Sequence, residues 1–348
     1  MARPDLTIMG AGIFGLSIAW AATLRGAKVR VIEAHAIGAG SSGGPVGSLS
    51  PHVPEAWNAK KAFQLESLLM AERWWNVVAH ASNLPTGYGR TGRLQPLANA
   101  RAVQIAVTRQ ATARTLWQGH AVWQVVSTTG AGWEPQSPCG QMVQDTLTAR
   151  LNPNQALTAL AAAITARGGE IIIGNSKPNG PTIWATGADG LSDLSAFVAQ
   201  PAGGGVKGQA LLLQHDARTL PQLFVDGLHI VPHANGTVAI GSTSEPTWTD
   251  PHSTDAQLDA LHQKAIAACP ILADAPVITR WAGIRPRAKS RAPMLGAWPN
   301  RPDHFIANGG FKIGFGMAPK VAETMADLVL DNINTIPPEF RVDTSLKR

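Results

Sequence analysis

The sequence predicts an α/β fold (α+β overall), in which a parallel-sheet domain is interleaved with a smaller antiparallel-sheet domain. Three observations favour this fold: a glycine-rich β-α-β unit near the N-terminus, strands of parallel-sheet type in the middle and near the C-terminus, and hairpin-like strands between them. The 348 residues are enough for about two domains. A content of 45% hydrophobic and 15% charged residues excludes a disordered chain and a long coiled coil.

The N-terminal unit consists of apolar runs on either side of a glycine turn. Leu6–Met9 predicts a strand, and the turn follows as Gly10-Ala-Gly12-Ile-Phe-Gly15. Residues 16–24 then predict a helix rich in Ala and Leu, and 28–33 predict a second strand. The order strand, glycine turn, helix and strand is that of a Rossmann-like unit.

The rest of the chain predicts further helices and strands. Helices are expected over 62–82, 154–167, 255–268, and from Pro319, a favourable first-turn residue, to about Asp331. Strands are expected over 170–173, 182–187, 211–213, 228–231, 237–241 and 304–307. The turn Ala234-Asn-Gly236 predicts a hairpin between 228–231 and 237–241. Between Tyr88 and Trp133, short segments alternate with Gly and Thr turns, which predicts more sheet.

Charge and cysteine content narrow the class of protein. The net charge is +6, but no long basic block of the kind found in nucleic-acid-binding arms is present. The densest cationic cluster, Arg285-Pro-Arg287-Ala-Lys289-Ser-Arg291, is consistent with either a solvated surface or a pocket for an acidic substrate. Cys139 and Cys269 lie far apart, so we expect buried thiols in a reducing compartment, with neither a disulfide framework nor a metal site.

The apolar stretch 6–24 has the hydropathy of a signal peptide or a membrane span. Three glycines at fixed spacing interrupt it, and Arg25 and Lys28 follow it at once. Both features favour the strand, turn and helix described above. No other stretch approaches the ~20 apolar residues that a span requires. We therefore expect a cytoplasmic protein without a membrane span.

The glycine turn has the spacing and context of a dinucleotide-binding motif. Gly10 permits the tight turn, Gly12 lets the backbone approach a pyrophosphate, and Gly15 lets the helix pack close to the strand. Glu33 ends the next strand, where its carboxylate can accept hydrogen bonds from a ribose diol. The motif leaves NAD and FAD open, whereas the acidic Glu33 disfavours NADP.

Several later segments of the sequence are rich in glycine and contain proline or charged residues at particular positions. They are Gly38-Ala-Gly-Ser-Ser-Gly-Gly-Pro-Val-Gly-Ser-Leu-Ser-Pro51, Ile183-Trp-Ala-Thr-Gly187, Val206-Lys-Gly-Gln-Ala210, Ile230-Val-Pro-His-Ala-Asn-Gly236, Ile240-Gly-Ser-Thr243, Trp281-Ala-Gly-Ile-Arg-Pro286, Pro293-Met-Leu-Gly296, Asn308-Gly-Gly-Phe-Lys-Ile-Gly314 and Met317-Ala-Pro319. Together they resemble the D-amino acid oxidase (DAO) superfamily of FAD-dependent oxidoreductases, and its glycine oxidase-like members in particular.

The resemblance implies oxidation of a small amino acid or amine by noncovalently bound FAD. In that family a hydride passes from the substrate Cα to flavin N5, the imine is hydrolysed to an oxo acid and ammonia or an amine, and molecular oxygen or another acceptor takes the electrons. The resemblance assigns cofactor contacts to Gly10, Gly12, Ile13, Phe14, Gly15, Glu33, Ala34, Gly40, Ser41, Ser42, Gly47, Ser48, Leu49, Ala185, Thr186, Gly187, Arg285, Gly310, Phe311, Lys312, Ile313 and Gly314.

The same resemblance assigns catalytic roles to three residues. Arg285 aligns with the family's carboxylate-binding arginine, and its planar guanidinium suits a bidentate clamp; the alternative is a surface arginine. Lys312 falls where glycine oxidase-like proteins often carry a second cation; the alternative is a solvated lysine. His229 stands where these oxidases often place a substrate tyrosine; the alternative is a strand histidine satisfied by its neighbours. Tyr88 is the only tyrosine of the sequence, which excludes a multi-tyrosine pocket.

The resemblance also divides the chain into two discontinuous domains. Residues 1–85, 141–198 and 283–348 are assigned to the FAD-binding domain, and 86–140 and 199–282 to the substrate-binding domain.

Two other functions remain open at this point. One is a D-amino acid dehydrogenase that uses an acceptor other than oxygen. The other is a tRNA-modifying flavoprotein, which the high pI permits; but no Arg/Lys-rich stripe with aromatics is present, so we do not expect a nucleic-acid partner. A small carboxylate-bearing amine is the expected substrate, and a homo-oligomer is left open.

Overall fold

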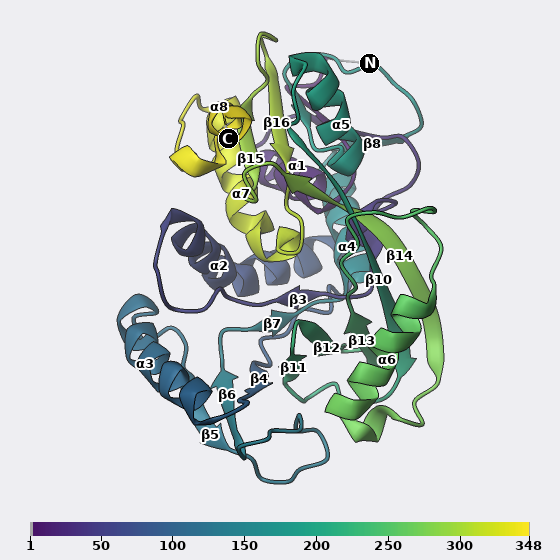
Figure 1. The fold of residues 1–348 in the computed structure, drawn as a ribbon. Coiled ribbons are helices and arrows are strands. Elements are labelled where there is room, and N and C mark those ends of the chain that lie inside the picture. Colours follow the sequence, from purple (N-terminus) through teal and green to yellow (C-terminus); the bar gives the residue numbers. More distant parts are fainter. Residues whose placement is uncertain (1–2, 348) are drawn as a thin grey trace.

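The computed structural model describes residues 3–347, which form two large sheets and a two-stranded ribbon (Figure 1). The first sheet has six strands in the order β15-β16-β9-β1-β2-β8. Its strands are β1 (Leu6–Met9), β2 (Val29–Glu33), β8 (Glu170–Ile173), β9 (Thr182–Trp184), β15 (Met294–Ala297) and β16 (His304–Asn308). Five are parallel, and β15 pairs antiparallel with β16. The sheet thus combines strands from both ends and the middle of the chain, as the sequence predicted.

The second sheet has eight strands in the order β14-β10-β13-β12-β11-β4-β6-β5. They are β4 (Arg93–Pro96), β5 (Trp123–Ser127), β6 (Gln141–Asp145), β10 (Gly203–Gln214), β11 (Gln222–Val225), β12 (Leu228–Pro232), β13 (Thr237–Gly241) and β14 (Val277–Ala288). All neighbours pair antiparallel except β4 and β11. The predicted hairpin of β12 and β13 is confirmed. The ribbon consists of β3 (Ser48–Leu49) and β7 (Ala149–Arg150).

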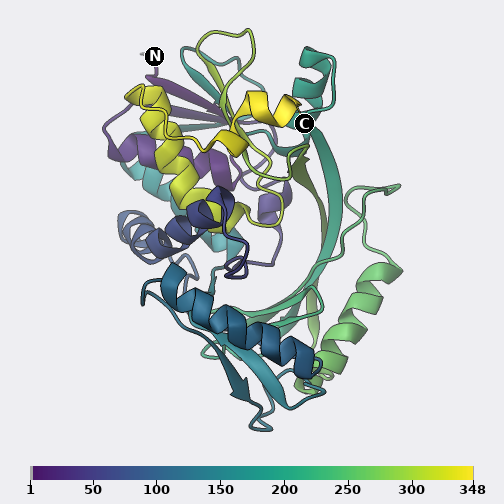
Figure 2. The same ribbon diagram turned by 60° about the vertical axis from the view of Figure 1, so that its left-hand side comes forward.

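Most helices pack beside one of the two sheets, and α5 (Gly187–Val198) contacts strands of both. Beside the six-stranded sheet, α1 (Ile13–Leu24), α2 (Ala59–Ser82), α4 (Pro153–Ala166) and α7 (Gly314–Leu330) pack on one another. Residues 13–23 of α1 are all buried, which explains why this helix is apolar on every face. In Figure 2, the long strands β10 and β14 curve from this half of the molecule to the other half, with α6 (Ala256–Ala268) on their convex side.

The remaining helices are short or lie at the edges of the sheets. They are α3 (Ala100–Leu116), α5 (Gly187–Val198), α8 (Val342–Lys347) and the 3-10 turns Ser41–Gly43, Pro270–Leu272 and Pro338–Phe340. Within residues 3–347, no helix combines the length and the apolar character that crossing a membrane requires.

Helix α3 is a correction to the sequence prediction of sheet throughout 88–133. Only Ala106 and Ala113 of α3 are fully buried, so no apolar stripe of helical period marks the segment. Its Val, Ile and Thr residues also resemble a strand in composition. The feature of the sequence that could have predicted this helix is its N-cap residue, Asn99, whose side chain accepts a hydrogen bond from Ala102 N.

The start of α7 is a second correction. The helix begins at Gly314, five residues before the predicted start, and Pro319 lies inside it. Met317 N already donates to Ile313 O at 3.0 Å, so the turn before Pro319 is helical. Pro319 removes one backbone donor from the helix, a cost that packing of α7 against α1 and α2 offsets.

Two of the predicted domain boundaries divide segments that the strand pairing keeps together. Residues 141–145, assigned to the FAD-binding domain, form β6 and pair with β4 and β5 in the eight-stranded sheet. The boundary at 283 falls inside β14, which is one continuous strand.

The turn between β1 and α1 depends on two glycines. Gly10 has φ +104°, and a Cβ on it would lie 2.5 Å from Ala185 O. A Cβ on Gly15 would lie 1.9 Å from Gly10 O and 3.4 Å from the Ile8 side chain. The absence of both side chains lets α1 start directly over the end of β1.

We therefore expect Gly15→Ala to lower the free energy of unfolding of the apoprotein by about 1–3 kcal/mol, because the clash is with backbone and cannot be relieved by a rotamer change. The measurement is urea unfolding followed by circular dichroism. The matched control is Gly40→Ala, since no atom lies within 4 Å of a Cβ there. Equal stability of the two variants would contradict this account of the turn.

Candidate active site

The carboxyl ends of the neighbouring strands β1 and β9 meet at one edge of the six-stranded sheet. The chain leaves β1 through α1 toward β2, but it leaves β9 through α5 toward the other sheet. Gly10, after β1, lies against Ala185 and Thr186, which follow β9, and Gly187 then begins α5. In open α/β sheets, ligands bind at such a switch in direction. The predicted contact residues of both strands therefore meet at one place.

Glu33 lies at the carboxyl end of β2, beside the glycine turn that follows β1. Its Oε2 accepts a hydrogen bond from Ala11 N at 2.8 Å, and its Oε1 accepts one from His35 N at 3.1 Å. These bonds fix the carboxylate on the glycine turn, with Ala34 next to it in the chain. Because a carboxylate has about four acceptor positions, both oxygens can still accept a ribose hydroxyl.

The start of α1 fits a phosphate group. Gly12 is its N-cap residue, without a side-chain cap and without an acidic side chain in the first turn. The loop Gly40-Ser41-Ser42 lies across this end, and Ser42 Oγ accepts a hydrogen bond from Ile13 N at 3.1 Å. The positive end of the helix dipole and the glycine backbone suit an anionic ligand.

The start of α7 lies beside the start of α1. A Cβ on Gly310 would meet the Phe14 ring at 2.9 Å, and one on Gly314 would meet Ile13 Cγ2 at 3.4 Å. Ile313 is the N-cap residue of α7. Two helix N-termini and their glycines therefore line one edge, which fits an extended dinucleotide.

The loop at 47–49 completes this edge. Ser48 and Leu49 form β3, and a Cβ on Gly316 of α7 would lie 3.9 Å from Leu49 Cα. A Cβ on Gly47 would lie 1.8 Å from Leu151 O, so only glycine lets the loop pass at this point.

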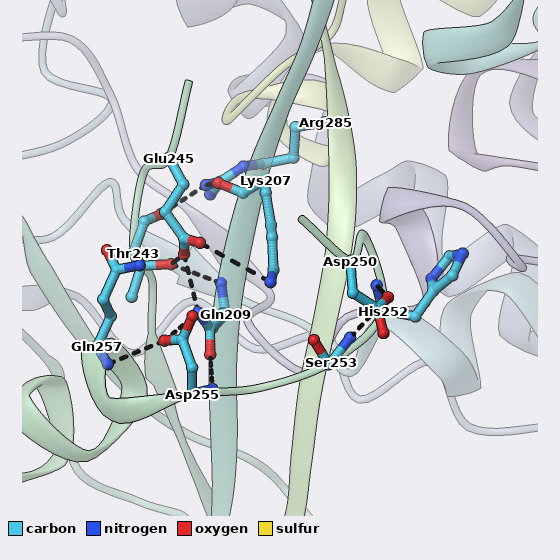
Figure 3. A network of polar contacts seen from close by, with 10 residues as sticks. All are labelled: Lys207, Gln209, Thr243, Glu245, Asp250, His252, Ser253, Asp255, Gln257 and Arg285. Atoms are coloured by element: carbon cyan, nitrogen blue, oxygen red, sulfur yellow. Dashed lines mark hydrogen bonds and ion pairs between the residues drawn. The ribbon is translucent and has the colours of Figure 1, made fainter. Parts of the chain in front are cut away.

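Arg285 lies on β14, opposite Val206 of β10. Its guanidinium crosses the β10 backbone over Gly208, where a Cβ would lie 2.1 Å from Arg285 Nη2. It donates to Ser242 Oγ at 2.5 Å. It also donates to Thr243 O at 2.5 Å and to Lys207 O at 3.2 Å, and Arg285, Thr243 and Lys207 are drawn in Figure 3.

The Arg285 guanidinium keeps unused donors although the residue is only 8% exposed. Three of its five N–H groups donate in the bonds above, and the buried Nε–H has no partner. Burial lowers the pKa of Arg285 to about 10, against the opposing effect of Glu245. The side chain is therefore charged at neutral pH and can still bind an anion.

Phe311 connects Arg285 with the start of α7. Its N–H donates to Pro286 O at 3.1 Å, and the Arg285 Cζ lies 5.6 Å from the centre of its ring. Arg287 Cζ and Lys312 Nζ lie 5.9 Å and 5.8 Å from the same ring centre. Partial desolvation and the Arg285 charge lower the pKa of Lys312. One aromatic ring therefore has three cations around it.

His229 is connected with this group through the charge of Lys312, which acts on its imidazole. Its ring centre lies 4.7 Å from that of Phe224, and its buried Nδ1 has no hydrogen-bond partner. Burial, and then the charges of Arg93 and Lys312, lower the pKa of His229 to about 3. The imidazole is neutral at physiological pH. The structure thus brings Arg285, Lys312 and His229 into one electrostatic neighbourhood.

Arg93 is a residue of this neighbourhood that sequence reasoning missed. It lies on β4 opposite Asp145 of β6, and its Nε is 2.8 Å from Asp145 Oδ2. Both side chains are buried, and the Arg93 Cζ lies 5.5 Å from the Phe224 ring centre. No motif marks this pair, because strand register brings its members together from distant parts of the chain.

Gly208 and Ser242 were also missed as contacts of Arg285. Both lie in segments quoted above for the family resemblance: Gly208 in Val206–Ala210, which is part of strand β10, and Ser242 in Ile240–Thr243. In the described part of the chain, no group of three or more His, Cys, Asp or Glu side chains is placed to hold a metal ion.

The chain is similar to known proteins over most of its length. Residues 5–328 match the DAO family model, which is described as FAD dependent oxidoreductase. The Bifunctional protein ThiO/ThiG of Nostoc sp. is 28% identical, with 94% of this chain and 53% of that protein covered. This chain therefore spans about half the length of that relative. The glycine oxidase of Geobacillus kaustophilus is 24% identical, with 94% of this chain and 93% of the relative covered.

Solved structures share the fold. The crystal structure of glycine oxidase from Geobacillus kaustophilus matches with a TM-score of 0.84 at 21% identity, covering 98% of this chain and 99% of that one. That of iminodiacetate oxidase from Chelativorans sp. BNC1 matches with a TM-score of 0.80 at 20% identity, covering 95% of this chain and 97% of that one. The predicted fold class is confirmed, and the match over residues 5–328 shows that the chain belongs to the DAO family of FAD dependent oxidoreductases.

Proposed function

We propose that this chain uses noncovalently bound FAD to oxidise a small amine in which the nitrogen and a carboxylate are bonded to the same carbon. One observation carries the proposal: two consecutive residues connect the glycine-lined edge with the buried arginine. Gly310 lies against Phe14 at the start of α1, and Phe311 lies against Arg285. A cofactor along that edge and a carboxylate on Arg285 would therefore be close neighbours.

The relatives support the same class of substrate. Two are named glycine oxidase and iminodiacetate oxidase. Glycine and iminodiacetate both have an amine nitrogen and a carboxylate on the same carbon. A buried cation with unused donors is the group that such a carboxylate requires.

In this proposal, side chains mainly bind and orient the substrate. When bound, FAD supplies the electron acceptor for the hydride of the substrate Cα–H. Arg285 binds the carboxylate through its unused N–H groups, and the Phe311 ring shields the guanidinium from water. Lys312 adds a second positive charge, and neutral His229 offers an uncharged polar contact through Nδ1. The imine product is then hydrolysed in water.

The first prediction concerns the cofactor. The purified protein is expected to be yellow. Acid precipitation should release its FAD, because neither Cys139 nor Cys269 lies in the segments proposed to contact the flavin. Absorbance of the pellet and of the supernatant checks this. Flavin that remains with the precipitated chain, or a colourless protein that takes up no FAD, would contradict the proposal.

The second prediction concerns Glu33. Glu33→Ala should raise the FAD dissociation constant by about 10- to 100-fold, the effect of losing hydrogen bonds to a charged acceptor. Equilibrium titration of the apoprotein with FAD measures it. The matched control is Glu170→Ala, which removes a carboxylate of β8 that pairs with Arg30 at the surface. Equal affinities of the two variants would remove Glu33 from the FAD site.

The third prediction concerns Arg285. Arg285→Ala should weaken substrate binding by about 2–5 kcal/mol and slow flavin reduction, since a loosely held substrate also misplaces its Cα–H. Arg285→Lys should keep only part of the substrate affinity and of the rate of flavin reduction, because an ammonium group cannot offer the planar set of N–H donors of a guanidinium. FAD content should stay normal in both variants.

The measurement is bleaching of the bound flavin by a panel of amines without oxygen. If Arg285→Ala reduces its flavin at the wild-type rate and affinity, the carboxylate site lies elsewhere in the cluster. Peroxide formation compared with dye reduction then distinguishes molecular oxygen from another electron acceptor.

A further inference from the structure

A buried polar network lies on the face of β10 opposite the Arg285 guanidinium (Figure 3). Successive side chains of a strand point to opposite faces, so Gly208 lies under the guanidinium while Lys207 and Gln209 point the other way. Lys207 is 2% exposed and Gln209 is fully buried, below the start of α6. Buried polar groups at this depth need hydrogen-bond partners.

The partners of Lys207 and Gln209 come from the segment that follows β13. Gln209 Nε2 donates to Glu245 Oε1 at 3.1 Å and to Asp255 Oδ1 at 2.8 Å. The Glu245 carboxylate also accepts a hydrogen bond from Thr243 Oγ1 and lies 3.9 Å from Lys207 Nζ. Thr243 Oγ1 in turn accepts from Gln209 N at 2.8 Å. These five side chains, of Lys207, Gln209, Thr243, Glu245 and Asp255, form one connected network.

The same segment carries acceptors for Arg285. Thr243 N donates to Gln209 O at 3.1 Å, and Lys207 and Glu245 exchange two backbone hydrogen bonds of 2.9 Å. These bonds hold 242–245 along β10, on the side away from β14. The Ser242 hydroxyl and the Thr243 carbonyl then receive the guanidinium that crosses from β14. The network fixes the place where Arg285 ends.

The carboxylates of the network contact or face Lys207 and not Arg285. Glu245 and Asp255 both interact with the Lys207 charge, whereas the described residues provide no carboxylate in ion-pair contact with Arg285. Arg287 and Lys312 lie around the same Phe311 ring as Arg285, and the Glu245 carboxylate raises the pKa of Arg285. A substrate carboxylate would supply the missing negative charge.

We propose that Lys207, Gln209, Thr243 and Glu245 are positioning residues, which hold the guanidinium of Arg285 in place for the substrate carboxylate. This inference rests on the proposed function. None of the four needs to contact the substrate, since their effect passes through the 242–245 segment.

The test measures binding of labelled acetate to the FAD-loaded protein by equilibrium dialysis. Thr243→Val keeps the shape but removes the hydroxyl that accepts from Gln209 N and donates to the Glu245 carboxylate, and it should weaken acetate binding by about 10-fold. Thr243→Ser keeps the hydroxyl and should stay within about 2-fold of wild type. FAD content shows that each variant is folded. A purely structural role of the side chain would move FAD content and acetate affinity together.

A second variant tests the charge of the network. Glu245→Gln removes the carboxylate that raises the pKa of Arg285, so the loss of acetate binding at alkaline pH should begin at lower pH. Asp250→Asn is the matched control, because Asp250 is a carboxylate of the same loop that accepts hydrogen bonds from His252 N and Ser253 N and does not act on Arg285. Asp250→Asn should not change the pH at which acetate binding is lost.

The outcomes separate the two proposals. If the wild-type protein neither binds acetate nor has its flavin reduced by any amine, the proposed function fails. If the wild type does both, but Thr243→Val and Glu245→Gln behave like Asp250→Asn, the positioning role is overturned.

Discussion

The antiparallel pairing of β10 with β14 is the interaction on which the candidate site depends. Its register places Arg285 opposite Val206 and directs the guanidinium over Gly208. The next residue of β14, Pro286, receives the Phe311 N–H and so fixes the loop before α7. One strand pair thus sets both the position of the buried cation and the position of the glycine-lined edge. Backbone hydrogen bonds, rather than flexible side chains, determine the distance between them.

Buried charge in the eight-stranded sheet is arranged around this pair. Arg93 with Asp145, and Lys207 with Glu245, are buried ion pairs, and burying either partner alone would cost several kcal/mol. Arg285 instead has neutral acceptors at its ends. Such acceptors lower the cost of desolvation without cancelling the charge. The sheet therefore keeps the buried positive charge of Arg285 available on the side of Phe311.

Local sequence signals predicted the parts of the structure that depend on local geometry. The turn 10–15 and Glu33 were found because spacing along the chain alone determines a β-α-β unit. The helix 100–116 was missed because few of its side chains are buried, and Pro319 was misplaced because packing against α1 and α2 overrode the preference of proline for a first turn. The contact of Gly208 with Arg285 depends on strand register between distant segments, which no local pattern specifies.

Gly208 and Arg285 also restrict how the two positions can change in evolution. The backbone at 208 is not left-handed, so a larger residue is excluded there by the guanidinium and not by conformation. A chain that first lost the arginine could then acquire a side chain at 208, whereas the reverse order would displace a functioning guanidinium. Once the space at 208 is filled, restoring the arginine alone would not restore its pose. The order of substitutions therefore matters, and loss of this contact would be difficult to reverse by a single substitution.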